Sequence, residues 1–574
     1  MEWIRCSPTA RRDWCWGLLG AALLYASYPP LNQPWLGWIA PACWIHLASR
    51  PDLWQRGTVW RLYGCGWIFW MAVLQWIRLP HPATYAGWVA LSAYLAIYVP
   101  CFIGSTHWWT HRRGWPLWLA APISWVGLEL LRSTLMTGFA MIALGHSQSA
   151  VLPILQLASL GGVYLISGLM VLVAASLTVA LSGPVVTPSP PNVAVRRTTQ
   201  RRFGPLVASL MLTAVAWWWG DQRLTSEATT EPATRAAVIQ GSIDTTFDGD
   251  PEFGSRTMEE YLSLTQQAVR DHEPLDLVIW PESMFGADAP LVKVEQPAAR
   301  PPEFQDTEQE YRDMLDQLVT YGERKMKYLS SLTGTYSLVG AQFWEADPQG
   351  RRLYNSALLI NPQGQLTGRY DKMHTVMFGE YIPLGEWFPW IYRLTPLPNG
   401  LTSGTGPQLF VVGQLRISPT VCFENLVPHL VRRQLAELAR KEQAGKDGAP
   451  NCLVTITNDG WFWGSSLLDL HLACGAFRAV ESDLPLLIAA NTGFSAHVSP
   501  RGKLLAVGPR RKQAVLLMEV VPGAGQSWYR RLGDWPFWPA VPIAVWPCLL
   551  AVYGRLRARR RDAKLSVTTE TRGE

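Results

Sequence analysis

Charged residues are scarce in this sequence: Asp, Glu, Lys and Arg make up only 16% of its 574 residues, while Trp alone occurs 30 times. So few charges and so many tryptophans exclude a chain whose whole surface meets water. The scarcity is uneven, because most charges lie between about 222 and 530, whereas the first 220 residues are largely apolar runs broken by short arginine-bearing loops. We therefore predict a membrane protein with a soluble domain inserted late in the chain.

Two further signatures are missing. The net charge of +6 does not come from one basic face, because the arginines fall between hydrophobic segments, a pattern that indicates membrane topology and not nucleic-acid binding. The nine cysteines form no CxxC pair and no metal-ligand spacing. Only Cys422, Cys452 and Cys474 lie in the polar region, and because three is odd, at least one of them stays unpaired within the chain.

Apolar runs of roughly 17 to 25 residues, the length that a bilayer core requires, predict eight membrane spans. They cover about 14–30, 33–49, 62–80, 86–109, 115–132, 158–182, 204–220 and 536–554. Arginines gather in alternate loops, beginning before the first span and ending after the eighth, as cytoplasmic segments do. Both termini are therefore predicted to be cytoplasmic, and the region between the last two spans extracytoplasmic.

Three domains follow from this topology: an N-terminal membrane domain (1–221), an extracytoplasmic domain (222–530), and a last span with a basic cytoplasmic tail (531–574). The first apolar run also has features of a cleaved signal peptide, since Arg11 and Arg12 precede it. The six spans that follow favour an uncleaved signal anchor.

The extracytoplasmic region alternates short β-rich runs with amphipathic helical ones. Strands or hairpins are predicted over 235–243, 275–283, 336–344, 356–372, 414–425, 451–459, 484–493 and 495–506, and helices over 252–270, 307–332, 424–443 and 466–483. Near-continuous apolar strands indicate burial on both faces. We expect a layered α/β domain in which helices cover the sheets.

Three polar residues end apolar strands: Glu282 after "DLVIWP", Lys372 after "GRYD" and Cys422 after "ISPTV". Ligand-facing groups of α/β domains collect at the carboxyl ends of strands, so these side chains could converge. A cysteine nucleophile needs activation, which a helix beginning near 424 would support through its dipole. Glu282 could then accept the thiol proton, and Lys372 could stabilise the thiolate and a tetrahedral oxyanion.

The motifs "LVIWPES", "YDKMHTVMFGEYIPLGEW" and "SPTVCFEN" resemble, in this order, the Glu-Lys-Cys motifs of the nitrilase (carbon–nitrogen hydrolase) superfamily. "FGEYIPL", "TNDGWFWGSSLLDLHLACGAFRAVE" (457–481) and "AANTGFSAHVSPRG" (489–502) resemble more narrowly the apolipoprotein N-acyltransferase family. That resemblance implies an α-β-β-α sandwich outside the membrane, with Glu282 as general base, Lys372 as oxyanion-stabilising residue and Cys422 as nucleophile. It also implies supporting roles for Glu380, Phe423, Glu424, Asn355 and Trp461.

The resemblance further implies ping-pong acyl transfer in the bacterial inner membrane, with the catalytic domain on the periplasmic side. The cysteine would take an acyl chain from a phospholipid as a thioester and pass it to the α-amino group of an S-diacylglyceryl cysteine on an apolipoprotein. The enzyme would act as a monomer, without metal or organic cofactor and without nucleic acid.

The chain departs from the family pattern at four places. Met377 replaces a proline, Phe423 lacks a tyrosine hydroxyl, Trp463 is an additional tryptophan, and Phe247 is only an approximate substitute for a family tryptophan. Two alternative functions therefore stay open: a membrane-tethered amidase that uses water as acceptor, and a degenerate scaffold that binds lipoproteins without acylating them. His471 is interpreted as a hydrogen-bonded structural residue.

Overall fold

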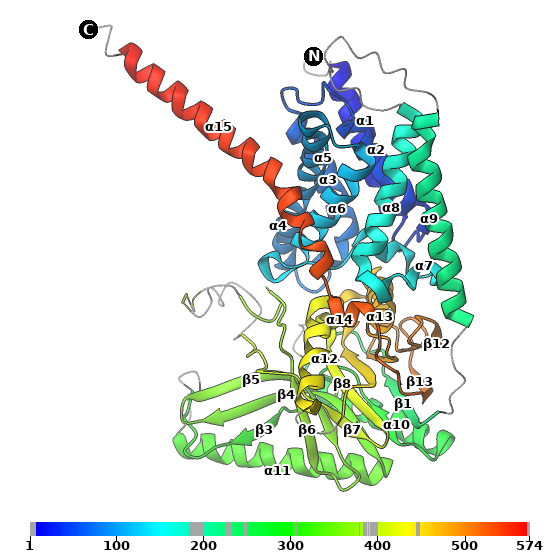
Figure 1. Ribbon diagram of the computed structural model, residues 1–574. Helices are drawn as coiled ribbons and strands as arrows, with labels where there is room; N and C mark the ends of the chain where they lie inside the picture. The colour runs from blue at the N-terminus through cyan, green and yellow to red at the C-terminus, as the bar shows by residue number, and fades with distance from the viewer. Residues whose placement is uncertain are drawn as a thin grey trace.

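The computed structural model describes residues 7–182, 200–225, 232–245, 250–301, 304, 307–377, 379–382, 387–388, 390, 400–443 and 448–570. A helical bundle and an α/β part lie one above the other (Figure 1). The α/β part is inserted between the last two long helices of the bundle, α9 (Gln200–Thr225) and α15 (Ala540–Glu570). Helix α1 begins, and α15 ends, at the end of the bundle that lies away from the α/β part.

The bundle contains a helix in each of the eight predicted apolar runs. Besides α9 and α15, these are α1 (Pro8–Ala26), α2 (Ala40–Ala48), α3 (Thr58–Val73), α6 (Leu117–Arg132) and α8 (Ala158–Ser182), while the run at 86–109 holds two helices, α4 (Thr84–Ala96) and α5 (Tyr98–Arg113). Short turns join them: η1 (Pro34–Trp38), η2 (Gln75–Arg78), η3 (Leu135–Thr137), η4 (Leu144–Gln148) and α7 (Leu152–Leu155). The run at 33–49 forms only η1 and the nine-residue α2, since Pro34 and Pro41 lie in the first turns of these two segments and cannot continue a helix from the preceding residues.

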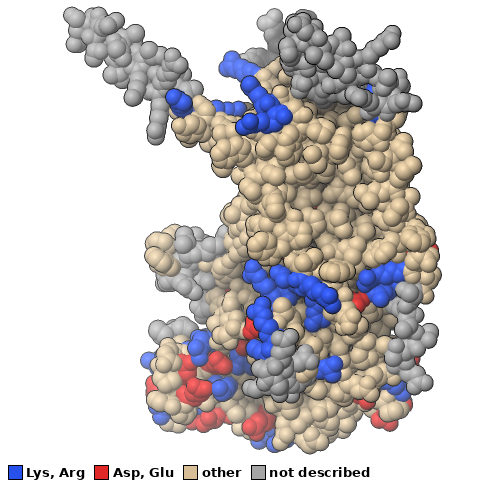
Figure 2. All heavy atoms as spheres, in the orientation of Figure 1, with Lys and Arg blue, Asp and Glu red and all other residues tan. Residues whose placement is uncertain are grey.

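Four segments of the described chain are long and apolar enough to cross a membrane: Thr84–Arg113, Ala158–Ser182, Arg202–Thr225 and Trp535–Arg557. The middle of the bundle shows almost no charged side chain on the face in Figure 2, whereas Lys and Arg gather at both of its ends. This distribution suits a protein embedded in a bilayer. The count of eight spans stays a prediction.

Two sheets form the centre of the α/β part. The first has the order β13-β1-β2-β4-β5-β6, with β3 also paired to β4, and the second has the order β12-β11-β10-β9-β8-β7. The strands of the first are β1 (Thr234–Gln240), β2 (Leu277–Ile279), β3 (Leu291–Val294), β4 (Tyr336–Asp347), β5 (Gly350–Ile360), β6 (Leu366–Asp371) and β13 (Ala514–Val520). The strands of the second are β7 (Phe410–Val412), β8 (Leu415–Val421), β9 (Cys452–Thr457), β10 (Leu486–Ala490), β11 (Ala496–Val498) and β12 (Leu504–Val507).

Helices cover the outer face of each sheet, which confirms the predicted layering. Helices α10 (Phe253–His272) and α11 (Glu308–Thr333) lie on the first sheet, and α12 (Pro428–Gln443) and α13 (Leu467–Ser482) on the second. In β1, Ala236 and Val238 enter the core between the sheets, while Ala237 and Ile239 pack against the helices. Burial on both faces explains why these strands are nearly continuous apolar runs.

The inserted part begins and ends on neighbouring strands. β1 and β13 pair antiparallel, with Thr234 opposite Val520. The chain therefore enters and leaves the first sheet at the same place. From β13 it returns to the bundle through α14 (Trp528–Leu532) and η8 (Trp535–Phe537).

Helix α13 joins the two parts of the molecule. Its residues Leu470, Cys474 and Phe477 belong to the same buried apolar cluster as Leu144 and Leu155 of the bundle. At the edge of this contact, Asp483 accepts a 3.1 Å hydrogen bond from Arg223 of α9. The second sheet is thus attached to the bundle through a shared core.

Candidate active site

The three sequence-predicted catalytic residues follow strands whose carboxyl ends point the same way. Glu282 follows β2 and Lys372 follows β6; β2 and β4 are parallel, and two antiparallel steps through β5 give β6 the same direction. Cys422 follows β8 of the facing sheet. The Nζ atom of Lys372 lies 3.8 Å from Glu282 Oε1, and both groups act electrostatically on the Cys422 thiol. The structure therefore brings the three side chains together.

Glu282 is a buried carboxyl with a defined pair of donors. Its Oε1 accepts a 2.6 Å hydrogen bond from Asn355 Nδ2 on β5, and its Oε2 accepts a 2.8 Å bond from the backbone N–H of Asn458 after β9. Burial raises the pKa of Glu282, Lys372 lowers it and Glu380 raises it again. A carboxyl held in place with a raised pKa suits a general base.

Lys372 is almost wholly buried, at 1% exposure. Its Nζ donates a 2.7 Å hydrogen bond to Glu380 Oε1. Burial alone would lower the pKa of Lys372, but the carboxylates of Glu380 and Glu282 raise it above the ordinary value, so the ammonium is retained. Glu380 also accepts a 2.8 Å bond from the backbone N–H of Val376, which fixes its carboxylate beside the lysine.

Cys422 is half-buried and has a left-handed backbone, with φ of 52°. It begins the short 3₁₀ turn η6 (Cys422–Leu426), and helix α12 begins only at Pro428. The expected helix beginning at 424 is therefore wrong, because the chain first makes this turn. The strained conformation points to a functional constraint on this residue.

Burial raises the pKa of the Cys422 thiol well above its usual range. Glu282 raises it further, Lys372 lowers it, and Asp459 raises it. The resting group is a thiol, so nucleophilic attack requires its proton to pass to a base at the same time. Glu282 is the carboxyl suited to accept it.

Glu424 accepts hydrogen bonds from four donors. They are the backbone N–H groups of Met373 at 2.7 Å, His374 at 3.0 Å and Val421 at 2.8 Å, and the hydroxyl of Tyr370 at 2.9 Å. This fully buried carboxyl therefore ties the turn at the cysteine to the segment that follows Lys372. Glu424 positions the loops and does not reach the reacting groups by any of these bonds.

The other predicted supporting residues lie around the same site. The Phe423 ring stacks on His374, with 5.8 Å between ring centroids. Trp461 is in η7 (Asp459–Phe462), whose Phe462 packs edge-on against Trp76 of the bundle.

Two of the residues that depart from the family pattern, Met377 and Trp463, can be placed in the structure, and Phe247 cannot. Met377 pairs with Tyr381 in an isolated bridge, and the Trp463 side chain is exposed. Phe247 lies outside the described residues.

The sequence analysis did not identify two groups that contact the site residues, the backbone N–H of Asn458 and the carboxylate of Asp459. The donor from Asn458 is a backbone N–H, which carries no side-chain signal; only its place after the apolar strand β9 could have indicated it. Asp459 accepts 3.1 Å bonds from Thr457 and from the His471 ring, so the acid and the histidine form a buried pair near the cysteine. Within the described part of the chain, no group of three or more His, Cys, Asp or Glu is placed to hold a metal ion.

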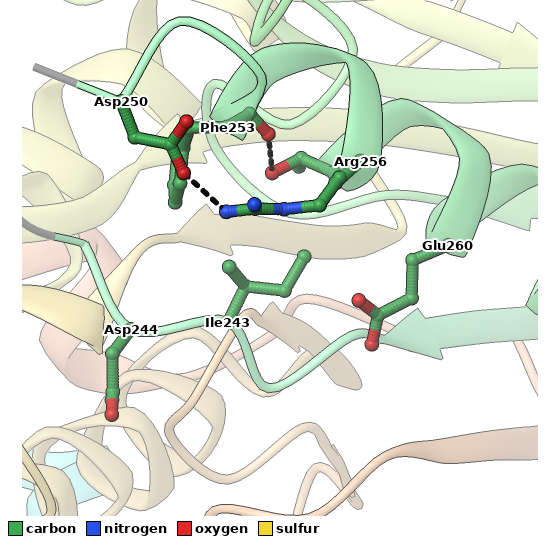
Figure 3. A pocket seen from close by; sticks show the side chains of 7 residues that line it. Ile243, Asp244, Asp250, Phe253, Arg256 and Glu260 are labelled. Atoms are coloured by element: carbon green, nitrogen blue, oxygen red, sulfur yellow. Dashed lines mark hydrogen bonds and ion pairs between the residues drawn. The ribbon is translucent and has the colours of Figure 1, made fainter.

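A separate hollow of about 230 Å³ lies beside the segment after β1 (Figure 3). Asp244, Asp250, Arg256 and Glu260 line it together with apolar groups. Asp250 pairs with Arg256, Asp244 with Arg511, and Glu260 with Gln513. No cysteine and no lysine is among its lining residues, so the hollow lacks the combination of groups found at Cys422.

Two family models match the chain: "Apolipoprotein N-acyltransferase N-terminal domain" over residues 20–176 and "Carbon-nitrogen hydrolase" over residues 235–530. An apolipoprotein N-acyltransferase from Geobacter metallireducens is 32% identical over 560 residues, covering 96% of each chain. A relative of the same name from Rhodopirellula baltica is 29% identical and covers 90% of this chain and 93% of its own. Another from Azotobacter vinelandii is 30% identical and covers 96% of this chain and 92% of its own. A solved amidase from Nesterenkonia sp. is 16% identical and covers 52% of this chain and 94% of its own, with a TM-score of 0.34.

Proposed function

Because the chain belongs to the apolipoprotein N-acyltransferase family, we propose that it moves an acyl chain from a membrane phospholipid to the N-terminal amine of S-diacylglyceryl-cysteine lipoproteins, through a thioester on Cys422. The similarity to enzymes of this name covers 96% of both chains, bundle and α/β part alike. The observation that carries the mechanism is the 3.8 Å approach of Lys372 to Glu282 beside the strained Cys422.

The first half-reaction forms the thioester. Cys422 Sγ attacks the carbonyl carbon of the phospholipid ester while its proton passes to Glu282, and the carbonyl oxygen becomes an oxyanion. The Lys372 ammonium offsets that charge. The tetrahedral intermediate then expels the lysophospholipid oxygen, which takes the proton back from the protonated carboxyl of Glu282, and Glu282 is again a carboxylate.

The second half-reaction repeats this geometry with an amine. The neutral α-amino group of the diacylated cysteine attacks the thioester carbonyl, and Glu282 accepts its surplus proton. Collapse of the intermediate forms the amide and releases the Cys422 sulfur, to which Glu282 returns the proton. The same base and ammonium thus serve both half-reactions.

The arrangement of the two parts suits substrates that are anchored in lipid. We propose eight spans, cytoplasmic termini and an α/β part on the periplasmic face of the inner membrane. The beginning of α1 and the end of α15 at the far end of the bundle support an even number of crossings. The shared core at α13 would hold the reactive cysteine close to the bilayer surface.

The full chain in phospholipid nanodiscs with a diacylated lipopeptide tests this function. We expect an N-acylated lipopeptide, lysophospholipid in equal amount, and a hydroxylamine-labile acyl group on Cys422 that Cys422→Ser lacks. Cys15→Ser, at an exposed cysteine of α1, is the matched control and should keep activity. Release of free fatty acid without amide would indicate an amidase-type hydrolase, and full transfer by Cys422→Ala would refute the thioester.

A further inference from the structure

The candidate active site holds more negative than positive groups. Four carboxyls lie around Lys372 and the cysteine: Glu282, Glu380, Glu424 and Asp459. A thiolate on Cys422 would add a further negative charge in a largely buried place, where like charges repel strongly. The single ammonium of Lys372 offsets only part of this negative charge. A second cation would therefore lower the pKa of the Cys422 thiol and favour its thiolate.

His471 is the side chain best placed to be that cation. It lies on α13, which packs against η6, and is 4% exposed. Its Nδ1 is 3.1 Å from Asp459 Oδ1, and the same oxygen accepts a bond from Thr457. Among the described residues, no group forms a hydrogen bond with its buried Nε2. The backbone of Cys422 lies near the ring.

The surroundings of the ring favour its protonated form. The groups that face His471 are Asp459 from η7, Glu282 from the end of β2 and the backbone of Cys422. Burial lowers the pKa of the imidazole, but these three raise it above the ordinary histidine value. His374, the other nearby histidine, behaves oppositely, because burial and Lys372 lower its pKa.

We propose that His471, protonated and held by Asp459, is a positioning residue that supplies the second positive charge beside Cys422 and eases formation of its thiolate. The inference rests on the proposed role of Cys422 as nucleophile. It assigns the Asp459–His471 pair an electrostatic role in place of the structural one expected from sequence. The ring lies beside the backbone of Cys422 and is 4% exposed, so its charge would act on the thiol without contact to substrate.

The pair predicts an unusual order among charge variants. His471→Asn keeps a donor toward Asp459 but removes the cation, leaving the Asp459 charge uncompensated near the thiol. Asp459→Asn removes the negative charge that keeps the His471 ring protonated, so the ring loses its positive charge as well. The two losses have opposite effects on the thiol pKa and largely cancel. The double variant removes both charges together, and it should be more reactive than His471→Asn alone.

Alkylation of Cys422 by iodoacetamide, followed by mass spectrometry of its peptide across pH, measures this in the full-length enzyme without lipid substrates. We expect His471→Asn to slow alkylation about tenfold near neutral pH, because one unit of thiol pKa changes the thiolate fraction tenfold. Asp459→Asn should stay near wild type, and the double variant should recover most of the loss. His497→Gln, at a buried histidine of β11 that burial keeps neutral, should match wild type.

A wild-type alkylation profile for His471→Asn, or a double variant no faster than His471→Asn, would overturn the inference. If His471→Asn does not give folded protein by thermal unfolding, His471→Gln, which keeps a donor at the Nε2 position, replaces it. Failure of the proposed function looks different: Cys422→Ala would then retain acyl transfer, whatever the alkylation rates of the other variants.

Discussion

The ammonium of Lys372 lies 2.7 Å from Glu380 and 3.8 Å from Glu282. The lysine is therefore held chiefly by Glu380, while the oxygens of Glu282 bond to Asn355 and Asn458. This division leaves Glu282 close enough to the cation to be oriented, but not so tightly paired that it loses its basicity. It is the relationship on which the first two predictions depend.

Replacing Glu380 by Gln should slow acyl-enzyme formation by about a hundredfold, the scale expected when a catalytic group is misplaced by about an ångström. Without the Glu380 charge, the ammonium turns toward Glu282 and lowers the pKa of that base. Single-turnover formation of the thioester measures the effect. Glu437→Gln breaks an exposed pair with Lys441 and should change nothing; a wild-type rate for Glu380→Gln would contradict this role.

The activity should fall at acid pH, at a value above the ordinary carboxyl range. Burial raises the pKa of Glu282 above 4.5, and the mechanism needs its carboxylate, so kcat/KM decreases as pH falls through the raised value. The stability contribution has the opposite sign: it is fully present below about 4.5 and is lost as pH rises through the folded-state pKa. The pH profile of kcat/KM checks this, and an acid limb at the pKa of an ordinary exposed glutamate would refute it.

Replacing Glu424 by Gln should impair both folding and activity. The NH₂ group of Gln would face donors, namely three backbone N–H groups and a hydroxyl, and could not accept their hydrogen bonds. Each buried donor left unpaired lowers the free energy of unfolding by about 1–3 kcal/mol. We expect a lower Tm and a loss of transfer. Tyr370→Phe removes one donor and leaves the others, so its Tm should fall less; the reverse order would contradict the account.

Replacing Gly340 by Ala should displace Glu282, the proposed general base. A Cβ at Gly340 would lie 2.5 Å from Glu282 Cα and 2.5 Å from the Pro281 carbonyl oxygen, both backbone atoms that can give way only by moving the strand end. Overpacking of this kind costs about 1–3 kcal/mol. The readout is kcat together with Tm, and Gly87→Ala, where nothing lies within 4 Å, is the matched control.

Phe423 should tolerate tyrosine better than alanine. Its ring stacks on His374, next to the proposed nucleophile Cys422, and such pairs contribute about 0.5–1.5 kcal/mol. Phe423→Ala should lose up to about tenfold in kcat/KM for the lipopeptide, while Phe423→Tyr keeps the ring. Equal activity in both variants would show that the stack does not matter to the reaction.

Local patterns predicted the helices of the α/β part well where one face is apolar. The ranges expected for α10, α11 and α13 differ from the observed ends by one or two residues. The missed strands are β3, β7 and β13: the first two have only four and three residues, too few for a periodic signal. β13 belongs to the first sheet only through its pairing with β1, a contact across nearly 300 residues of chain.

The meeting of Glu282, Lys372 and Cys422 was foreseeable because each follows a strand whose carboxyl end faces the same side. The roles of the residues around them were harder to predict. Glu380 lies eight residues past the lysine in irregular chain, so only the family resemblance indicated it. The bond from the Asn458 N–H to Glu282 depends on how β9 approaches the first sheet, and the Asp459–His471 pair depends on how α13 packs on the end of β9; no local pattern determines either.

The antiparallel pairing of Thr234 with Val520 closes the inserted part where the polypeptide arrives and departs. The two-sheet part can consequently be inserted into a membrane protein at a single position in the chain, with all of its internal strand pairs intact. The bundle therefore has to accommodate only two neighbouring strand ends, whatever the size of the unit between them.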